Sequence, residues 1–153
     1  MDIMKEPKTF RVAQKIFITN EKNELFVVRF ASISSNEKTL WGKWDFPGGG
    51  VEIDESLREG IQREIREEIG NVEIEIGRPI LCWDFWMKSL GKEIVRTVAI
   101  GITGKWKSGN IVLNEEHDAF RWISTEKVLS LDWDSSHKRG LTQYLAYVKE
   151  REI

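Results

Sequence analysis

Apolar residues follow two different spacings along this chain of 153 residues. Four stretches are rich in β-branched and aromatic residues, a composition typical of strands. These stretches run from Phe10 to Thr19, from Leu25 to Phe30, from Ile74 to Met87 and from Ile94 to Trp106. A polar segment, 20–24, separates the first two stretches, and we expect them to form a β-hairpin. Shorter strands are predicted at 44–46 and at 120–123.

A helical spacing begins after the first strand-rich part. Apolar residues recur every four positions from Leu57 to Ile69, which predicts a helix with one apolar stripe. Asp54 or Ser56 is suited to cap the start of this helix, and Gly70 is suited to end it.

Two further helices are predicted towards the end of the sequence. Ser124 is suited to cap a short helix that runs through Ser130, and Ser135 or Ser136 to cap a last helix. The last helix carries apolar residues on one face, at positions 141, 145 and 148. The order of elements predicts a mixed sheet with helices on its faces, in the α+β class or as an α-β-α sandwich.

The first helix carries an unusual group of acids. At 100° per residue, Glu64, Glu67 and Glu68 share one face within about 100°. Like charges at this spacing repel by roughly 0.2–0.5 kcal/mol per pair, so a bound cation would compensate for them. Carboxylate oxygens are hard ligands and favour Mg²⁺ or Mn²⁺. For the helix alone, a solvated face on which Arg63 and Arg66 pair with the acids is the alternative.

A run of glycines precedes this helix. The residues Pro47-Gly48-Gly49-Gly50 interrupt the preceding strand, and we expect a loop whose backbone can approach a ligand closely. The carbonyls of such a loop would add further hard ligands. A loop that cradles phosphate on backbone amides is the alternative, although the Gly-Lys-Ser/Thr sequence of a P-loop is absent.

The segment from Gly49 to Gly70 resembles the signature of the Nudix hydrolases. That signature is Gly, five residues, Glu, seven residues, then Arg-Glu-apolar-x-Glu-Glu-x-Gly-apolar. The matching residues are Gly49, Glu55, Arg63, Glu64, Ile65, Glu67, Glu68 and Gly70. Only Asn71 departs, at the final apolar position. The preceding Trp44-Asp45-Phe46-Pro47-Gly48-Gly49 is similar to the family's Trp-x-apolar-Pro-Gly-Gly, and the chain is identified as a member of this family.

The resemblance implies one Nudix domain over 1–153, with an α-β-α sandwich around a mixed sheet. It also implies cleavage of a nucleoside diphosphate linked to another group, by water and a divalent metal, Mg²⁺ with Mn²⁺ as the substitute. The implied metal ligands are the Gly48 carbonyl, Glu64, Glu67, Glu68 and Glu116. Glu64 or Glu116 would activate water, and Arg63 would orient a carboxylate.

Five residues are candidates for binding the substrate. The resemblance suggests a phosphate contact for Arg29, and Arg96 interrupts an apolar strand where an anionic partner would be needed. The rings of Trp44, Phe46 and Trp83 are of the kind that stack on a base. The alternatives are surface ion pairs for the two arginines and packing in the core for the three rings.

Composition narrows the range of partners. Lys and Arg number 23 and Asp and Glu 25, for a net charge of −2, which leaves no electrostatic footprint for long nucleic acids or membranes. Cys82 is the only cysteine, so an intrachain disulfide is excluded. No apolar run approaches a membrane span, and the first residues lack the apolar segment of a signal peptide. We therefore expect a cytoplasmic protein.

The activity expected is Mg²⁺-dependent hydrolysis of a nucleoside triphosphate, ordinary or oxidised, to the monophosphate and pyrophosphate, because the chain is similar to the mutator-type triphosphatases. The alternatives are hydrolysis of a dinucleoside polyphosphate, ADP-ribose or an RNA cap, and a non-catalytic module that senses a nucleotide. Dimers are common in the family, but no feature of this sequence selects a homodimer.

Overall fold

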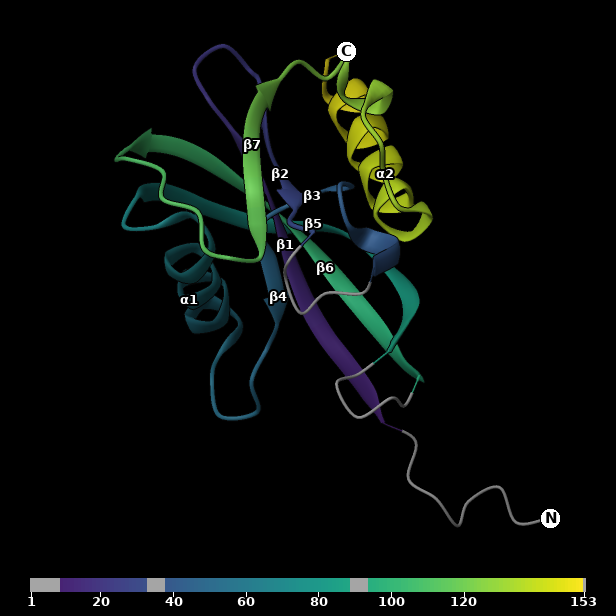
Figure 1. Ribbon diagram of the computed structural model, residues 1–153. Helices are drawn as coiled ribbons and strands as arrows, with labels where there is room; N and C mark the ends of the chain where they lie inside the picture. Colours follow the sequence, from purple (N-terminus) through teal and green to yellow (C-terminus); the bar gives the residue numbers. More distant parts are fainter. Residues whose placement is uncertain (1–8, 33–37, 89–93, 153) are drawn as a thin grey trace, which may run out of the picture.

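The computed structural model describes residues 9–32, 38–88 and 94–152, and these form one mixed sheet with a helix on each face (Figure 1). The strands are β1 (Phe10–Thr19), β2 (Leu25–Phe30), β3 (Trp44–Asp45), β4 (Gly48–Gly50), β5 (Glu73–Lys88), β6 (Ile94–Ser108) and β7 (His117–Ile123). The helices are α1 (Leu57–Ile69) and α2 (Ser135–Arg151), with 3₁₀ turns at Lys38–Leu40 and Val128–Ser130.

Strand β1 organises the sheet because it pairs on both sides. Along its whole length it lies parallel to β6, from Phe10 opposite Arg96 to Thr19 opposite Lys105. On its other side it pairs antiparallel with β4 and, at its end, with β2. The sheet order is β3-β2-β1-β6-β5, with β4 beside β1 and β7 beside β2. The predicted mixed sheet is confirmed, and so are strands at the four stretches rich in β-branched and aromatic residues.

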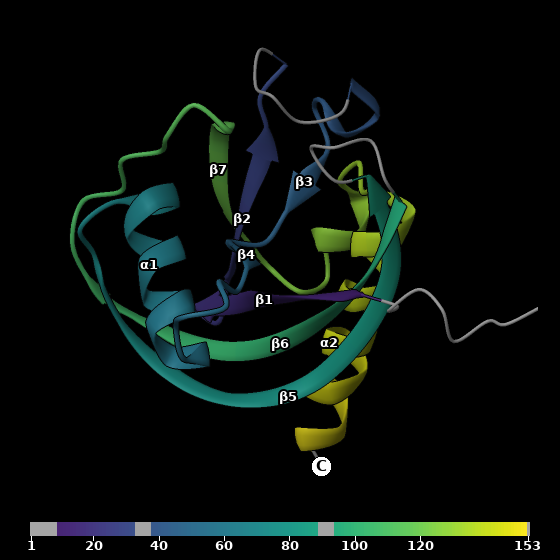
Figure 2. The ribbon, with the colours of Figure 1, turned by 90° about the horizontal axis from the view of Figure 1, so that it is seen from below.

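Residues of β1 alternate between two apolar cores. Ile16 and Ile18 pack with three isoleucines of α1, whereas Phe17 packs with Leu141 and Tyr144 of α2. Figure 2 shows the two helices on opposite sides of the sheet, with β5 and β6 curving beneath. This two-sided burial is the α-β-α sandwich predicted from the sequence.

Local signals explain where α1 begins and ends. Ser56 is the N-cap, and its Oγ accepts a hydrogen bond from the backbone N–H of Glu59 at 3.1 Å. Gly70 ends the helix with a φ of 95°, a value that glycine adopts without strain. Of the two predicted caps, Ser56 is therefore correct.

Three predictions about local structure are wrong. The glycines 48–50 form strand β4 rather than a loop, because their backbone pairs with β1. The predicted helix from Ser124 to Ser130 is only the 3₁₀ turn Val128–Ser130. Helix α2 is capped by Asp134 rather than by either serine, since the Asp134 carboxylate accepts from the Ser136 backbone N–H at 3.0 Å.

No helix in the described parts of the chain combines the length and the apolar character that crossing a bilayer requires.

Replacing Ser56 with alanine removes the N-cap of α1, and we expect the free energy of unfolding to fall by about 1 kcal/mol. Asp54→Ala is the matched control, because Asp54 is exposed and does not form the cap. Urea unfolding followed by circular dichroism measures both variants. Equal losses in the two variants would contradict the role of Ser56.

Candidate active site

Arg63 lies at the centre of the acidic face of α1. Its Nε and Nη2 donate to the two carboxylate oxygens of Glu55 at 3.0 and 2.7 Å, and its Nη1 donates to Glu64 and Glu67 at 3.1 and 3.2 Å. Nη2 also donates to the carbonyl of Gly50 at 3.1 Å. The hydrogen bonds from Arg63 are the main reason that the pKa of Glu55 falls to about 2. One guanidinium thus joins the helix, the preceding loop and β4.

Glu64 lies directly over β4. A β-carbon built on Gly49 would stand 2.6 Å from Oε1 of Glu64, closer than two such atoms can approach. The Glu64 side chain is 13% exposed, so its carboxylate is held against the strand and still reaches solvent. A side chain at position 49 would therefore displace the Glu64 carboxylate from the strand.

Glu68 is the buried member of the acidic group, with 3% of the residue exposed. Its Oε2 accepts a hydrogen bond from the backbone N–H of Gly48 at 3.2 Å. Burial raises the pKa of Glu68 well above its usual value, and repulsion from Glu64 adds to this although the charge of Lys15 opposes it. Such a carboxyl group favours a nearby cation, which would offset the cost of its charge.

The oxygen donors around β4 fit a hard divalent cation. They are the Gly48 carbonyl and the carboxylates of Glu64, Glu67 and Glu68, the last three from one helix face. Among the described residues, no three acidic, histidine or cysteine side chains converge as a closed set of ligands. In this structure Arg63 forms ion pairs with Glu64 and with the half-exposed Glu67. The type of donor suits Mg²⁺ or Mn²⁺.

Glu116 approaches the same acidic group from the segment before β7. Its backbone N–H donates to Oδ1 of Asn114 at 3.1 Å, and its carbonyl accepts from the N–H of Ala31 at 2.8 Å. Partial burial raises the pKa of Glu116, and the charge of Glu64 raises it further. The negative charges of the α1 glutamates therefore repel the carboxylate of Glu116.

A buried ion pair behind β4 was not predicted. The Nζ of Lys15 donates to Oδ2 of Asp45 at 2.8 Å and to the carbonyls of Phe46 and Gly48 at 3.3 and 3.4 Å. Oδ1 of Asp45 lies 3.3 Å from Nε2 of His137. Burial lowers the pKa of Lys15, but the charges of Asp45 and the site acids outweigh it and raise the pKa overall. The one sequence signal was a charge at each of positions 15 and 45, inside apolar stretches.

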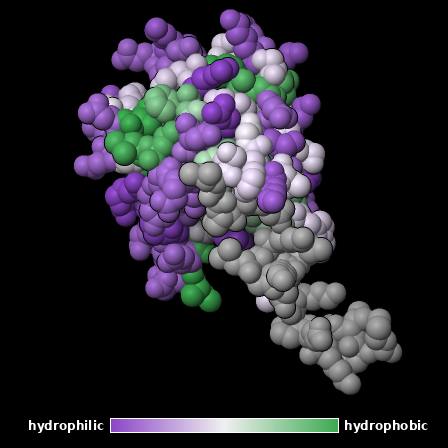
Figure 3. Space-filling model, in the orientation of Figure 1, coloured by the Kyte–Doolittle hydropathy of each residue, from purple (hydrophilic) through white to green (hydrophobic). Residues whose placement is uncertain are grey.

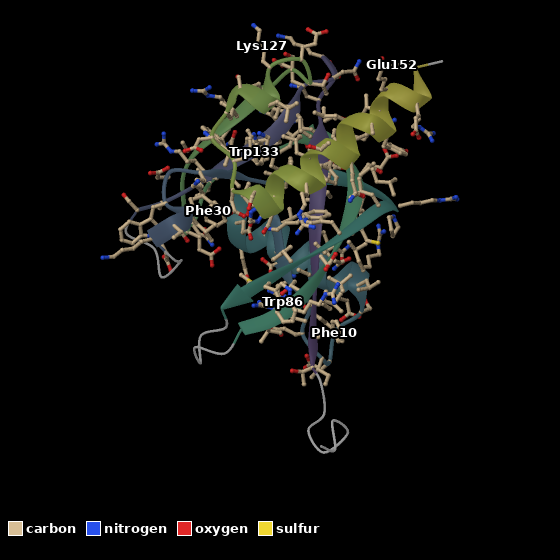
Figure 4. All side chains as sticks on the ribbon, turned by 90° about the vertical axis from the view of Figure 1, so that its right-hand side faces the viewer. Phe10, Phe30, Trp86, Lys127, Trp133 and Glu152 are labelled. Carbon is tan, nitrogen blue, oxygen red and sulfur yellow. The ribbon has the colours of Figure 1, made fainter. Side chains whose placement is uncertain are left out.

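The three candidate stacking rings lie in the core. Trp44, Phe46 and Trp83 are buried in the cluster beneath α2, and Figure 4 shows this cluster's Trp133 close to that helix. In this structure none of the three offers a free face to a base. Arg29 stands nearer the surface, with its Nε 2.8 Å from Oδ1 of Asp118.

Arg96 stands apart from the acidic face of α1. On β6, Arg96 is the cross-strand partner of Phe10 at the start of β1. Strand β4 pairs with β1 only from Ala13 onwards, three residues further along β1. The Nη2 of Arg96 lies 2.7 Å from Asp84, and its guanidinium lies 5.9 Å from the Trp86 ring centre. Figure 4 shows Phe10 and Trp86 together at this end of the sheet. Asp84 thus supplies the anionic partner that the sequence analysis required.

The surface over α1 is hydrophilic, as Figure 3 shows. In this region the contacts above bring Arg63 together with Glu64 and Glu67, and Gly48 together with Glu68. Such a group of carboxylates and backbone oxygens can hold a metal ion and accept a proton from water.

A family model, two curated proteins and a solved structure are similar to this chain. A family model, the NUDIX domain, matches residues 9–145. An RNA pyrophosphohydrolase of Pseudomonas fluorescens is 28% identical over 137 residues, covering 79% of this chain and 80% of that protein. The nucleoside triphosphatase NudI of Klebsiella pneumoniae is 29% identical over 109 residues, covering 67% and 76%. The crystal structure of a MutT protein from Methanosarcina mazei is 29% identical, with a TM-score of 0.70 over 94% of this chain and 98% of that one.

Lys15→Met leaves the Asp45 carboxylate buried without its ammonium partner, and we expect a loss of about 3–5 kcal/mol in the free energy of unfolding. Adding Asp45→Asn removes the unpaired buried charge of Asp45. We therefore expect the double variant to recover most of the lost free energy of unfolding. Chemical denaturation of the wild type, both single variants and the double variant measures the coupling. Losses that simply add would contradict a direct interaction between the two residues.

Proposed function

The chain belongs to the Nudix family of hydrolases, which act on phosphoric anhydrides, and from this premise we propose that it cleaves a nucleoside 5′-triphosphate group with Mg²⁺. Water attacks, the bond between the α- and β-phosphates breaks, and a monophosphate and pyrophosphate are released. The observation that carries the proposal is the set of glutamates on α1 that Arg63 holds against the glycine strand β4.

The proposal assigns metal binding and proton transfer to particular residues of the site. In the proposal the Gly48 carbonyl, Glu64, Glu67 and Glu68 hold Mg²⁺, with Glu116 as a further ligand. The ion, when bound, polarises a phosphoryl oxygen and lowers the pKa of a water. Glu64 and Glu116 are our two candidates for accepting the proton of that water.

The arginines have separate tasks in this proposal. Arg63 keeps the carboxylates of Glu64 and Glu67 oriented through its Nη1. Arg29 lies near the surface, where it pairs with the exposed Asp118 and its guanidinium lies 5.8 Å from the centre of the Trp44 ring. In the proposal it exchanges Asp118 for a substrate phosphate. An exposed ion pair of this kind contributes little stability, so the exchange costs little.

A free nucleotide is our first choice of substrate, and the triphosphate end of an RNA is the second. The net charge of −2 disfavours a long nucleic acid, whose binding depends on many cationic contacts. The similarity to RNA pyrophosphohydrolases favours the RNA end. Both substrates present the same triphosphate to the site, so the chemistry proposed is the same.

The proposed function is tested with a panel of substrates and resolved products. The panel contains ordinary and oxidised nucleoside triphosphates, triphosphorylated and capped RNA, ADP-ribose and dinucleoside polyphosphates. We expect a monophosphate end and pyrophosphate from a triphosphate, with activity lost in EDTA and restored by Mg²⁺. Cleavage of ADP-ribose alone would overturn the proposed substrate, and tight nucleotide binding without any hydrolysis would indicate a sensor.

Glu67→Gln keeps the shape of the side chain and removes its charge, so we expect Mg²⁺-dependent turnover to fall by at least about tenfold. Glu67 is 54% exposed, and the free energy of unfolding should change little. Glu75→Gln is the matched control, because Glu75 is an exposed acid that pairs with Lys107 on the sheet. Unchanged turnover and metal dependence in Glu67→Gln would exclude this glutamate as a ligand.

A further inference from the structure

A line of polar contacts crosses the sheet from the start of α2 to the acidic face of α1. Oδ2 of Asp134, the N-cap of α2, lies 3.3 Å from Nδ1 of His137, whose Nε2 lies 3.3 Å from Asp45. Asp45 accepts from Lys15 at 2.8 Å, and Lys15 donates to the Gly48 carbonyl at 3.4 Å. The N–H of the same Gly48 donates to Glu68 at 3.2 Å.

The middle of this line is buried. Lys15, Asp45 and His137 are each less than a tenth exposed. Burying two charges costs desolvation that their attraction often fails to recover, so a buried ion pair is weak grounds for a role in stability. The geometry has a more specific feature, because Nζ of Lys15 also contacts the backbone carbonyls of Phe46 and Gly48. The ammonium therefore holds the strand that carries the proposed metal ligand.

Among the described residues, the carbonyls of β4 are otherwise held by the pairing with β1 and by the hydrogen bond from Arg63 to Gly50. Strand β4 consists of three glycines, so it has no side chains to pack. Gly48 has a φ of 134°, a region that side chains rarely allow. Lys15 is the cross-strand partner of Gly48 in the register of β1 and β4. The backbone pairing places Lys15 opposite Gly48, and the Lys15 side chain donates to the Gly48 carbonyl.

We propose that Lys15, Asp45 and His137 are positioning residues that orient the Gly48 carbonyl for metal binding. The inference rests on the proposed function, in which that carbonyl is a ligand. Lys15 aims the carbonyl, Asp45 neutralises and holds Lys15, and His137 holds Asp45. The pair of Lys15 and Asp45 has no net charge, so it repels an approaching cation only weakly.

The decisive variant is the double substitution Lys15→Met with Asp45→Asn. It removes the hydrogen bond to Gly48 and leaves the net charge of the pair at zero, so any effect on metal binding reports position rather than charge. The asparagine Oδ1 still accepts from the N–H of Phe46, as the Asp45 oxygen does at 2.7 Å. Thr97→Val is the matched control, since Thr97 is a fully buried polar residue of the same sheet, outside the line of contacts.

Mn²⁺ is the probe, and its binding to the protein without nucleotide is followed by electron paramagnetic resonance. We expect the dissociation constant to rise about 10- to 100-fold in the double variant, as when partners of metal ligands are removed elsewhere, and to stay unchanged in Thr97→Val. Circular dichroism verifies that both variants are folded. Wild-type affinity in the folded double variant would overturn the inference.

A second pair of variants tests His137 and does not depend on the double variant. His137→Leu removes the contact with Asp45, whereas His137→Gln keeps an N–H donor near the position of Nε2. We expect weaker Mn²⁺ binding in the leucine variant and recovery of most of that loss in the glutamine variant. Equal losses in the two would overturn the role of His137. A wild-type protein that binds no Mn²⁺ and hydrolyses no nucleotide would instead contradict the proposed function.

Discussion

Repulsion among the glutamates of α1 is the constraint on which the arrangement around β4 depends. Acids three and four residues apart on one helix face destabilise it, and here three of them meet a strand made of glycine. Arg63 relieves part of this repulsion by donating to Glu64 and Glu67 and also binds the Gly50 carbonyl. The absence of side chains on β4 lets the Glu64 carboxylate lie against the strand. The same contacts place the carboxylates of Glu64, Glu67 and Glu68 along β4.

Much of the fold could be predicted from the sequence because its signals are local. The four long strands follow from runs of β-branched and aromatic residues, and α1 from an apolar stripe with a serine cap. Strand β4 could not be predicted in this way, since three glycines carry no pattern and pair only because β1 offers an edge. The cap of α2 was assigned to Ser135 or Ser136 rather than to Asp134, because all three residue types are favoured at a helix N-cap.

In the candidate site, too, residues close in sequence could be predicted, and residues that only the fold brings together could not. The acids of α1 could be found because helical spacing alone puts them on one face. Lys15, Asp45 and His137 come from β1, β3 and α2, and only the folded sheet brings them within contact. For Trp44, Phe46 and Trp83, the identity of the residue is compatible both with stacking on a base and with packing in the core. Which one applies depends on how α2 covers the sheet, and the structure buries all three.

The parallel pairing of β1 with β6 has a consequence for the order in which the chain is assembled. Strand β1 comes before the other described strands in the sequence and its parallel partner lies far along the chain, because Phe10 pairs with Arg96 and Thr19 with Lys105. Pairings so far apart in sequence are slow to form. During synthesis the parallel pairing of β1 therefore waits for β6, and Phe17 waits longer for its packing partners, Leu141 and Tyr144 of α2. Binding by a chaperone during translation is most useful to this protein in that interval.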